Sequence, residues 1–175
     1  MEGNYRLERE NLWAPWRIKY VQGLNKVGEC FLCRSIKDLQ EDAANLVLWR
    51  TPRCIVILNR FPYNNGHLLI APLRHIGGFE EAMDEELLEL TKLVRESQKA
   101  LSLAIKPHGF NVGMNFGRCA GAGLPDHLHI HIVPRWDGDT NYMKVCSDTA
   151  VISQSLTELL ELLKQISKTH NLPRL

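Results

Sequence analysis

Three histidines, His127, His129 and His131, alternate with branched or long apolar residues over residues 127–133. Because successive side chains of a strand point to opposite faces, this spacing predicts a strand that turns its imidazoles to one face and its apolar residues to a core. The ordinary pKa of imidazole lies near neutrality, so the row could supply a base, an acid, a nucleophile or metal ligands. Two sites fit the pattern: a catalytic metal held by alternate histidines, or a nucleophilic histidine that attacks phosphorus while its neighbours orient it.

The loop before the histidine run is rich in glycine over residues 117–123. Glycines leave backbone N–H groups unblocked near the imidazoles, which suits a phosphate whose charge develops during transfer. The loop therefore favours the nucleophilic site, with Gly121 and Gly123 as candidate substrate-binding residues. The same glycines could also simply make a flexible hairpin loop.

Cys30 and Cys33 have the spacing of a metal-binding knuckle or of a redox pair. A redox pair would be expected to open a helix in a strand–helix–strand unit, and the flanking residues do not have that pattern. We therefore favour a metal site over a redox pair. An odd number of cysteines, five, also favours reduced thiols over a disulfide framework.

The elements that must position these groups follow from short apolar segments separated by turn residues. Strands are predicted over residues 46–49, 54–59, 67–72, 110–115 and 127–133, and helices over residues 84–105 and from Ser155 onward. Because consecutive strands are joined by tight turns, we expect an α+β fold with about five antiparallel strands and two main helices. We expect an N-terminal arm (1–28), a catalytic domain (29–145) and a C-terminal helix (146–175) packed on that domain.

Composition limits the partners. A chain of 175 residues, 45% of them hydrophobic, fits one globular domain. The formal net charge of +1 and the pI near 7.7 give no reason to expect nucleic acid or an anionic membrane as a partner. The chain shows no apolar signal core and no apolar run near the roughly 18 residues that cross a bilayer. We therefore expect a cytoplasmic protein.

Residues 127–133 resemble the His-φ-His-φ-His-φ-φ signature of the histidine triad superfamily of nucleotide hydrolases and transferases. Residues 58–74 resemble the fragile-histidine-triad branch, whereas residues 12–17 and 133–136 are more similar to bacterial diadenosine tetraphosphate phosphorylases. The similarity covers residues 12–145. It implies a HIT-like fold and a homodimer whose sheet continues across the interface. It also implies cleavage of a dinucleoside polyphosphate at the α-phosphorus through a nucleotidyl-histidine intermediate, with water or orthophosphate as acceptor.

The resemblance also implies catalytic roles. His129 matches the nucleophile, and His131 and His67 match the histidines that surround it. Relatives often carry Ser or Thr at the position of Leu124, where a hydroxyl can reach the phosphate. This departure puts assistance to the leaving group in doubt.

Further positions match substrate-binding residues of the family. Asn59 matches a ribose-contacting residue, and its amide can both donate to and accept from paired hydroxyls. Asn115 lies one residue out of register with a phosphate-binding glutamine. Ile57 and Leu69 share the faces of Asn59 and His67, and they are candidates either for an adenine pocket or for the core.

Several relatives bind zinc through a cysteine pair, a histidine after the third strand and the first histidine of the signature. The matching set is Cys30, Cys33, His75 and His127. A closed set of this kind would make the zinc structural. A divalent cation could in addition accompany the polyphosphate.

Two other functions stay open at this point. The same histidine could act on a P–N bond, which would make the protein a nucleoside phosphoramidate hydrolase. The protein could also be a non-enzymatic module that binds nucleotides or nucleic acid, since Trp13, Trp16, Arg17 and Lys19 combine stacking and charge. Few basic residues lie near those aromatics, so packing of the arm on the sheet or on a partner subunit explains them better.

Overall fold

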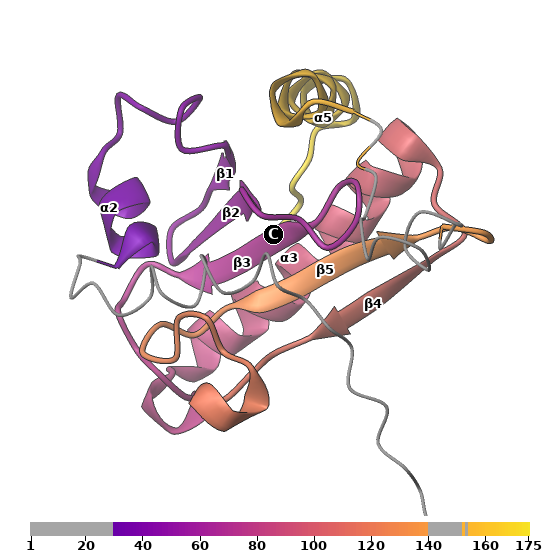
Figure 1. The fold of residues 1–175 in the computed structure, drawn as a ribbon. Helices are drawn as coiled ribbons and strands as arrows, with labels where there is room; N and C mark the ends of the chain where they lie inside the picture. Colours follow the sequence, from indigo (N-terminus) through magenta and orange to yellow (C-terminus); the bar gives the residue numbers. More distant parts are fainter. Residues whose placement is uncertain (1–29, 140–151, 153) are drawn as a thin grey trace, which may run out of the picture.

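The computed structural model describes residues 30–139, 152 and 154–175, whose strands form one five-stranded antiparallel sheet (Figure 1). Neighbouring strands pair in the order β1, β2, β3, β5, β4. They span Val47–Arg50 (β1), Cys54–Leu58 (β2), Leu68–Pro72 (β3), Gly109–Gly113 (β4) and Ile130–Arg135 (β5). This confirms the predicted α+β fold class. The predicted arm (1–28) and the predicted boundary at residues 145 and 146 lie outside the described residues.

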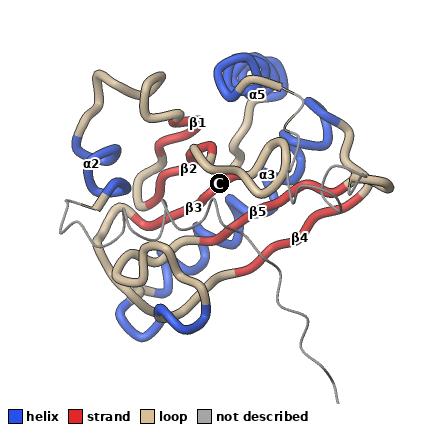
Figure 2. Tube along the Cα trace, in the orientation of Figure 1, coloured by secondary structure: helices blue, strands red, loops and turns tan. Residues whose placement is uncertain are grey.

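In the part of the chain that the structure describes, three α-helices and two short 3-10 helices accompany the sheet. Their arrangement is drawn in Figure 2. They span Phe31–Lys37 (α2), Phe79–Glu81 (η1), Asp84–Ile105 (α3), Arg118–Ala120 (η2) and Leu156–His170 (α5). Helices α3 and α5 are the two main helices that the sequence predicts. Helix α2 is a difference, because no helix is predicted beside the cysteine pair. Its N-cap is Cys30, whose sulfur accepts the backbone N–H of Cys33 at 3.5 Å.

One face of the sheet packs on α3 and α5 and buries the main hydrophobic core. The apolar residues of the histidine run, Leu128, Ile130 and Ile132, belong to this core, as predicted. Helix α3 starts with three acidic residues, which suit the positive end of its dipole. The Glu86 carboxylate also accepts the backbone N–H of Met83 at 2.9 Å, which fixes the first turn.

The opposite face carries a smaller apolar cluster and the candidate site residues. Leu32 of α2 is fully buried there against Ile55, Ile57 and Leu69 of strands β2 and β3. Because strand side chains alternate between faces, His131 of β5 lies on this same face, beside Leu69 in the neighbouring strand. Because α2 packs on this face, the cysteine pair at its start lies on the same side of the sheet as the histidines.

The strand predicted over residues 127–133 is shorter than expected, because β5 begins only at Ile130. His127 and His129 precede it in a segment that bonds to the loop after β3, where the Leu128 N–H donates to the Ile76 carbonyl at 2.6 Å. This contact replaces the regular pairing of a sheet. The segment that carries the two histidines is therefore bonded to this loop rather than paired as a strand of the sheet.

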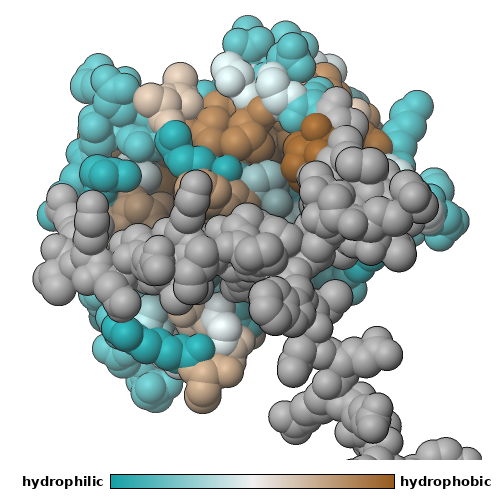
Figure 3. Space-filling view, in the orientation of Figure 1, coloured by the Kyte–Doolittle hydropathy of each residue, from teal (hydrophilic) through white to brown (hydrophobic). Residues whose placement is uncertain are grey.

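The described surface in the view of Figure 1 is polar around its periphery, and apolar residues are visible between α2 and α5 (Figure 3). The turn between β2 and β3 exposes two aromatic residues, Phe61 and Tyr63. Within the described ranges, no helix is both long and apolar enough to cross a lipid bilayer.

Candidate active site

The turn before β3 and strand β5 bring His67 and His131 together. His67 is completely buried, and its Nε2 lies 2.9 Å from Nδ1 of His131. The ring of His129 lies against that of His131, with 4.9 Å between the ring centroids. The three histidines predicted to form the catalytic group are therefore neighbours in space.

The hydrogen bonds around His67 fix which of its ring nitrogens carries the proton. The backbone N–H of Tyr63 donates to His67 Nδ1 at 3.1 Å, so Nδ1 is an acceptor. The Asn59 amide donates to the same nitrogen at 3.2 Å, and its oxygen accepts the backbone N–H of Phe61 at 2.9 Å. The proton of neutral His67 therefore lies on Nε2, which donates to His131 Nδ1. It follows that His131 carries its own proton on Nε2.

His129 has the opposite tautomer. Its Nδ1 lies 2.7 Å from the backbone carbonyl oxygen of His127, which can only accept, so Nδ1 carries the proton. The lone pair is left on Nε2. The site thus presents a lone pair on one imidazole, His129, beside an N–H on the next, His131.

Burial keeps these imidazoles neutral. Desolvation, assisted by the neighbouring imidazoles, lowers the pKa of His67 to about 3 and that of His131 to about 4. Burial also lowers the pKa of His129, although its hydrogen bond to the His127 carbonyl opposes the shift. The neutral tautomers are therefore the species present at neutral pH.

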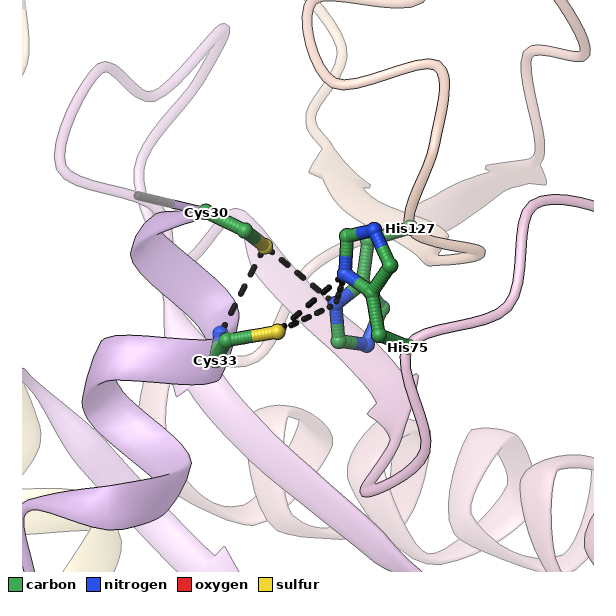
Figure 4. Close-up of side chains that lie close together, drawn as sticks. All are labelled: Cys30, Cys33, His75 and His127. Atoms are coloured by element: carbon green, nitrogen blue, oxygen red, sulfur yellow. Dashed lines mark hydrogen bonds between the residues drawn. The ribbon is translucent and has the colours of Figure 1, made fainter. Parts of the chain in front are cut away.

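A second group, which we name the cysteine–histidine cluster, lies at the other end of the histidine run (Figure 4). It consists of Cys30, Cys33, His75 and His127, and its four ligand atoms all lie within 4.8 Å of one another. Nδ1 of His127 lies 3.3 Å from Cys30 Sγ and 3.3 Å from His75 Nδ1. Cys33 Sγ lies 3.1 Å from His75 Nδ1. The fold thus brings together the four residues predicted as metal ligands.

The donor set fits a tetrahedral zinc ion. Zinc–ligand bonds of about 2.0–2.3 Å place the ligand atoms roughly 3.3–3.8 Å apart, close to the separations in the cluster. Nε2 of His127 donates to the carbonyl of Pro72 at 2.9 Å, which leaves the Nδ1 lone pair directed at the cluster. Burial raises the pKa of the Cys30 thiol to about 11, so a thiolate there requires a nearby cation.

Helix α2 also bears on the redox alternative. A redox pair is expected to open a helix, and Cys30 does so here, against the expectation from sequence. The neighbouring sheet is nevertheless antiparallel, and each sulfur lies within 3.3 Å of an imidazole nitrogen. The metal interpretation accounts for both imidazoles, and the redox interpretation accounts for neither.

Ile57 and Leu69, the candidates for an adenine pocket, are only 3% and 4% exposed. Both pack in the apolar cluster beneath α2. The core alternative left open by the sequence accounts for their burial. Leu124, which stands where relatives often have Ser or Thr, packs against the same cluster.

The glycine-rich loop has its own internal contacts. Gly117 and Gly121 have φ angles of 76° and 88°, which L side chains adopt only with strain. The Asn115 amide donates to the Gly121 carbonyl at 3.5 Å. The roles of Asn115, Gly121 and Gly123 toward a phosphate stay predictions.

Sequence reasoning missed Tyr63. Its ring centroid lies 4.7 Å from that of His67 and 5.8 Å from that of His131. Neither the residue type of Tyr63 nor its spacing from the histidines indicates a place in the site. The position of its ring depends on the backbone path of an irregular turn, which the sequence pattern does not predict.

Known proteins match both the sequence and the fold. A family model described as "HIT domain" matches residues 40–138, more than half of the chain. The AP-4-A phosphorylase of Mycobacterium tuberculosis is 34% identical over 165 residues, which cover 90% of this chain and 84% of that protein. This chain belongs to the HIT domain family.

HIT proteins of known structure share the fold. A hypothetical histidine triad nucleotide-binding protein from Sulfolobus tokodaii has a TM-score of 0.65 and 27% identity, and the match covers 80% of this chain and 93% of that one. A Zn-bound histidine triad family protein from Mycobacterium smegmatis has a TM-score of 0.65 at 19% identity, over 82% and 96% of the two chains. The second likeness concerns the fold alone. Together they confirm the HIT-like fold that the resemblance implies.

Proposed function

We propose that this HIT enzyme cleaves dinucleoside polyphosphates, such as diadenosine tetraphosphate, through a covalent nucleotidyl intermediate on His129. The observation that carries the proposal is the 2.7 Å hydrogen bond from His129 Nδ1 to the His127 carbonyl. It leaves the lone pair on Nε2, where it can attack phosphorus. The activity named for the M. tuberculosis relative supports the substrate class.

In the first step, His129 Nε2 forms a bond to the α-phosphorus while the anhydride P–O bond to the leaving nucleotide breaks. The electron pair of that bond stays on the leaving phosphate oxygen. Positive charge develops on the attacking ring, and the carbonyl of His127 stabilises it through Nδ1–H. His131 Nε2–H donates to a phosphate oxygen as its negative charge grows, and His67 holds His131 in this tautomer.

In the second step, water or orthophosphate attacks the phosphorus of the adduct, and an attacking water releases one proton to bulk solvent. The P–N bond breaks and its electron pair returns to Nε2 of His129. Water releases the bound group as a nucleoside monophosphate, and orthophosphate releases it as a nucleoside diphosphate. The identity of the product therefore reports the acceptor.

We assign the ribose to Asn59. Its amide has one N–H and one oxygen lone pair beyond its bonds to His67 and Phe61, enough for a pair of hydroxyls. We assign the polyphosphate to Asn115 and to the backbone of Gly121 and Gly123, with a divalent cation as its companion.

The cysteine–histidine cluster would hold one zinc ion. When bound, the ion would supply a structural crosslink between α2 and the histidine run, with no open position for substrate. Its thiols require a reducing compartment, which fits the expected cytoplasmic location.

We extend the proposal to a homodimer in which the sheet continues from β4 into a second copy. Strand β4 forms one edge of the described sheet, and its Val112 side chain is 44% exposed. An edge strand of this kind has unpaired backbone groups available to another strand. Light scattering of the purified protein would show twice the mass of the chain, and a monomer would contradict this part of the proposal.

Incubation with diadenosine tetraphosphate and Mg²⁺, with and without orthophosphate, tests the function directly. We expect AMP with ATP when water is the acceptor, and ADP with ATP when orthophosphate is. Quenched reactions should contain an acid-labile nucleotidyl adduct that His129→Asn lacks. Turnover of adenosine phosphoramidate but of no polyphosphate would overturn the substrate, and binding without turnover of either would favour a non-enzymatic module.

A further inference from the structure

The ring of Tyr63 lies across the two hydrogen-bonded histidines, His67 and His131. Its plane is tilted by 35° from that of His67 and by 27° from that of His131, where the rings are stacked. Tyr63 is nevertheless 55% exposed, so burial of its own surface does not explain this position. One part of the ring contacts the site while much of the residue remains outside the core.

The turn that carries Tyr63 is fastened to the end of β5. The Asn64 amide donates to the Pro134 carbonyl at 3.1 Å and to an Asp139 carboxylate oxygen at 2.9 Å. Gly66 has a φ of 77°, and a Cβ there would lie 2.7 Å from a carbon of Ile105, so the turn also depends on a glycine. The place of the Tyr63 ring is therefore set by the fold.

Tyr63 contacts the pair in two independent ways. Its backbone N–H donates to His67 Nδ1 and sets the tautomer, and its ring covers the His67–His131 hydrogen bond. A change of side chain removes the second contact and leaves the first. A substitution at Tyr63 can therefore test the ring contact while the backbone N–H continues to set the tautomer of His67.

We propose that Tyr63 is a positioning residue: its ring holds His131 with Nε2–H toward the reacting phosphate and favours the positive charge that this imidazole gains. An aromatic face attracts a cation placed over it, and the attraction grows when water is excluded. As negative charge develops on the phosphate oxygen that accepts from Nε2–H, His131 becomes more positive beneath the ring. The inference rests on the proposed function, since it assigns a donor role to His131.

Two substitutions at Tyr63 test the ring. Tyr63→Phe keeps the aromatic face and should leave kcat within about 2-fold of the parent. Tyr63→Leu removes the face and should lower kcat about 10-fold, within the range of a cation–π contact, while KM changes less than about 3-fold. Phe79→Leu, at an exposed aromatic that contacts Phe116, is the control for loss of a surface ring.

A second readout does not depend on activity. Nitrogen-15 NMR of the imidazoles should show the His67 Nε2–H proton in slow exchange in the parent and in Tyr63→Phe, and broadened or lost in Tyr63→Leu. Thermal unfolding would confirm that each variant folds. If Tyr63→Leu keeps both the parental kcat and this signal, or if Tyr63→Phe is as impaired as Tyr63→Leu, the ring has no positioning role. If the parent turns over no nucleotide, the proposed function fails, and the NMR comparison alone still decides the positioning role.

Discussion

The cysteine–histidine cluster and the proposed catalytic histidines use the same short run of sequence in opposite ways. His127 donates from Nε2 to the Pro72 carbonyl and directs Nδ1 at two sulfurs and a second imidazole. His129 donates from Nδ1 to the His127 carbonyl and keeps its lone pair on Nε2. In the cluster, ligand atoms converge on one point, whereas the catalytic group presents one lone pair beside one N–H. The backbone carbonyl that each imidazole contacts thus distinguishes the proposed metal ligand, His127, from the proposed nucleophile, His129.

The largest effect should come from removing the proposed nucleophile, His129. His129→Asn should lower turnover by about 10⁴-fold or more, because covalent catalysis loses its pathway, while substrate affinity is largely kept. Single-turnover kinetics and equilibrium binding measure the two effects. His170→Asn, at an exposed histidine of α5, is the matched control. If His129→Asn retains turnover, His129 is not the nucleophile, and the proposed contrast between the cysteine–histidine cluster and the catalytic histidines is wrong.

Loss of the cysteine–histidine cluster should lower the stability of the fold more than it lowers the rate of the reaction. Cys30→Ser with Cys33→Ser should abolish about one equivalent of bound zinc and lower the unfolding free energy by about 4 kcal/mol when free zinc is 1,000-fold above its Kd. Elemental analysis and urea unfolding measure these changes. Cys119→Ser, at an exposed thiol outside the cluster, is the control. A parent without zinc, or a double variant that keeps it, would contradict the metal site.

A substitution at Asn59 tests whether the proposed catalytic group also binds the ribose of the substrate. Asn59→Ala should reduce transition-state stabilisation by about 1–3 kcal/mol and narrow the preference for ribose over dideoxyribose substrates. The ratio of kcat/KM for the two substrates measures this preference, with Asn45→Ala as a control outside the site. If activity falls while the ratio is unchanged, Asn59 acts only through its hydrogen bond to His67.

The most gradual effect is the pH dependence of stability that the buried imidazoles produce. An imidazole of the unfolded chain has a pKa near 6.5, whereas burial lowers the pKa of His67 to about 3 and that of His131 to about 4 in the folded protein. The unfolded state therefore binds more protons as the pH falls below 6.5, and the unfolding free energy should decrease by up to about 1.4 kcal/mol per pH unit for each imidazole.

Urea unfolding of the Cys30→Ser, Cys33→Ser variant between pH 7 and pH 5 would measure this slope without a contribution from zinc. A flat profile would mean that the two imidazoles are not held neutral. The parent should show a steeper profile, because protons also compete with zinc for the cluster.

Much of the fold was predictable because its signals are local. The spacing of apolar residues predicts α3 with the bounds that it has, and the alternation along residues 127–133 correctly assigns Leu128, Ile130 and Ile132 to the core. The gathering of the two cysteines with two histidines follows from the family resemblance rather than from spacing.

The remaining features depend on contacts between distant segments. Helix α2 is capped by a sulfur, which is not among the usual capping groups. The segment just before β5 bonds to Ile76, and the tautomers of His127 and His129 depend on where the Pro72 and His127 carbonyls lie. The types and spacing of the residues do not predict any of these hydrogen-bond partners. The position of Tyr63 beside the histidines is not predicted for the same reason.

The bond from His129 to the His127 carbonyl has a consequence for how the protein tolerates change. The acceptor belongs to the main chain, so it is present whichever side chain occupies position 127. A related protein could therefore lose the proposed metal ligand at position 127 without losing the carbonyl that orients the imidazole of His129. Because the acceptor is a main-chain group, the proposed metal site and the proposed nucleophile can change independently of each other within one short segment.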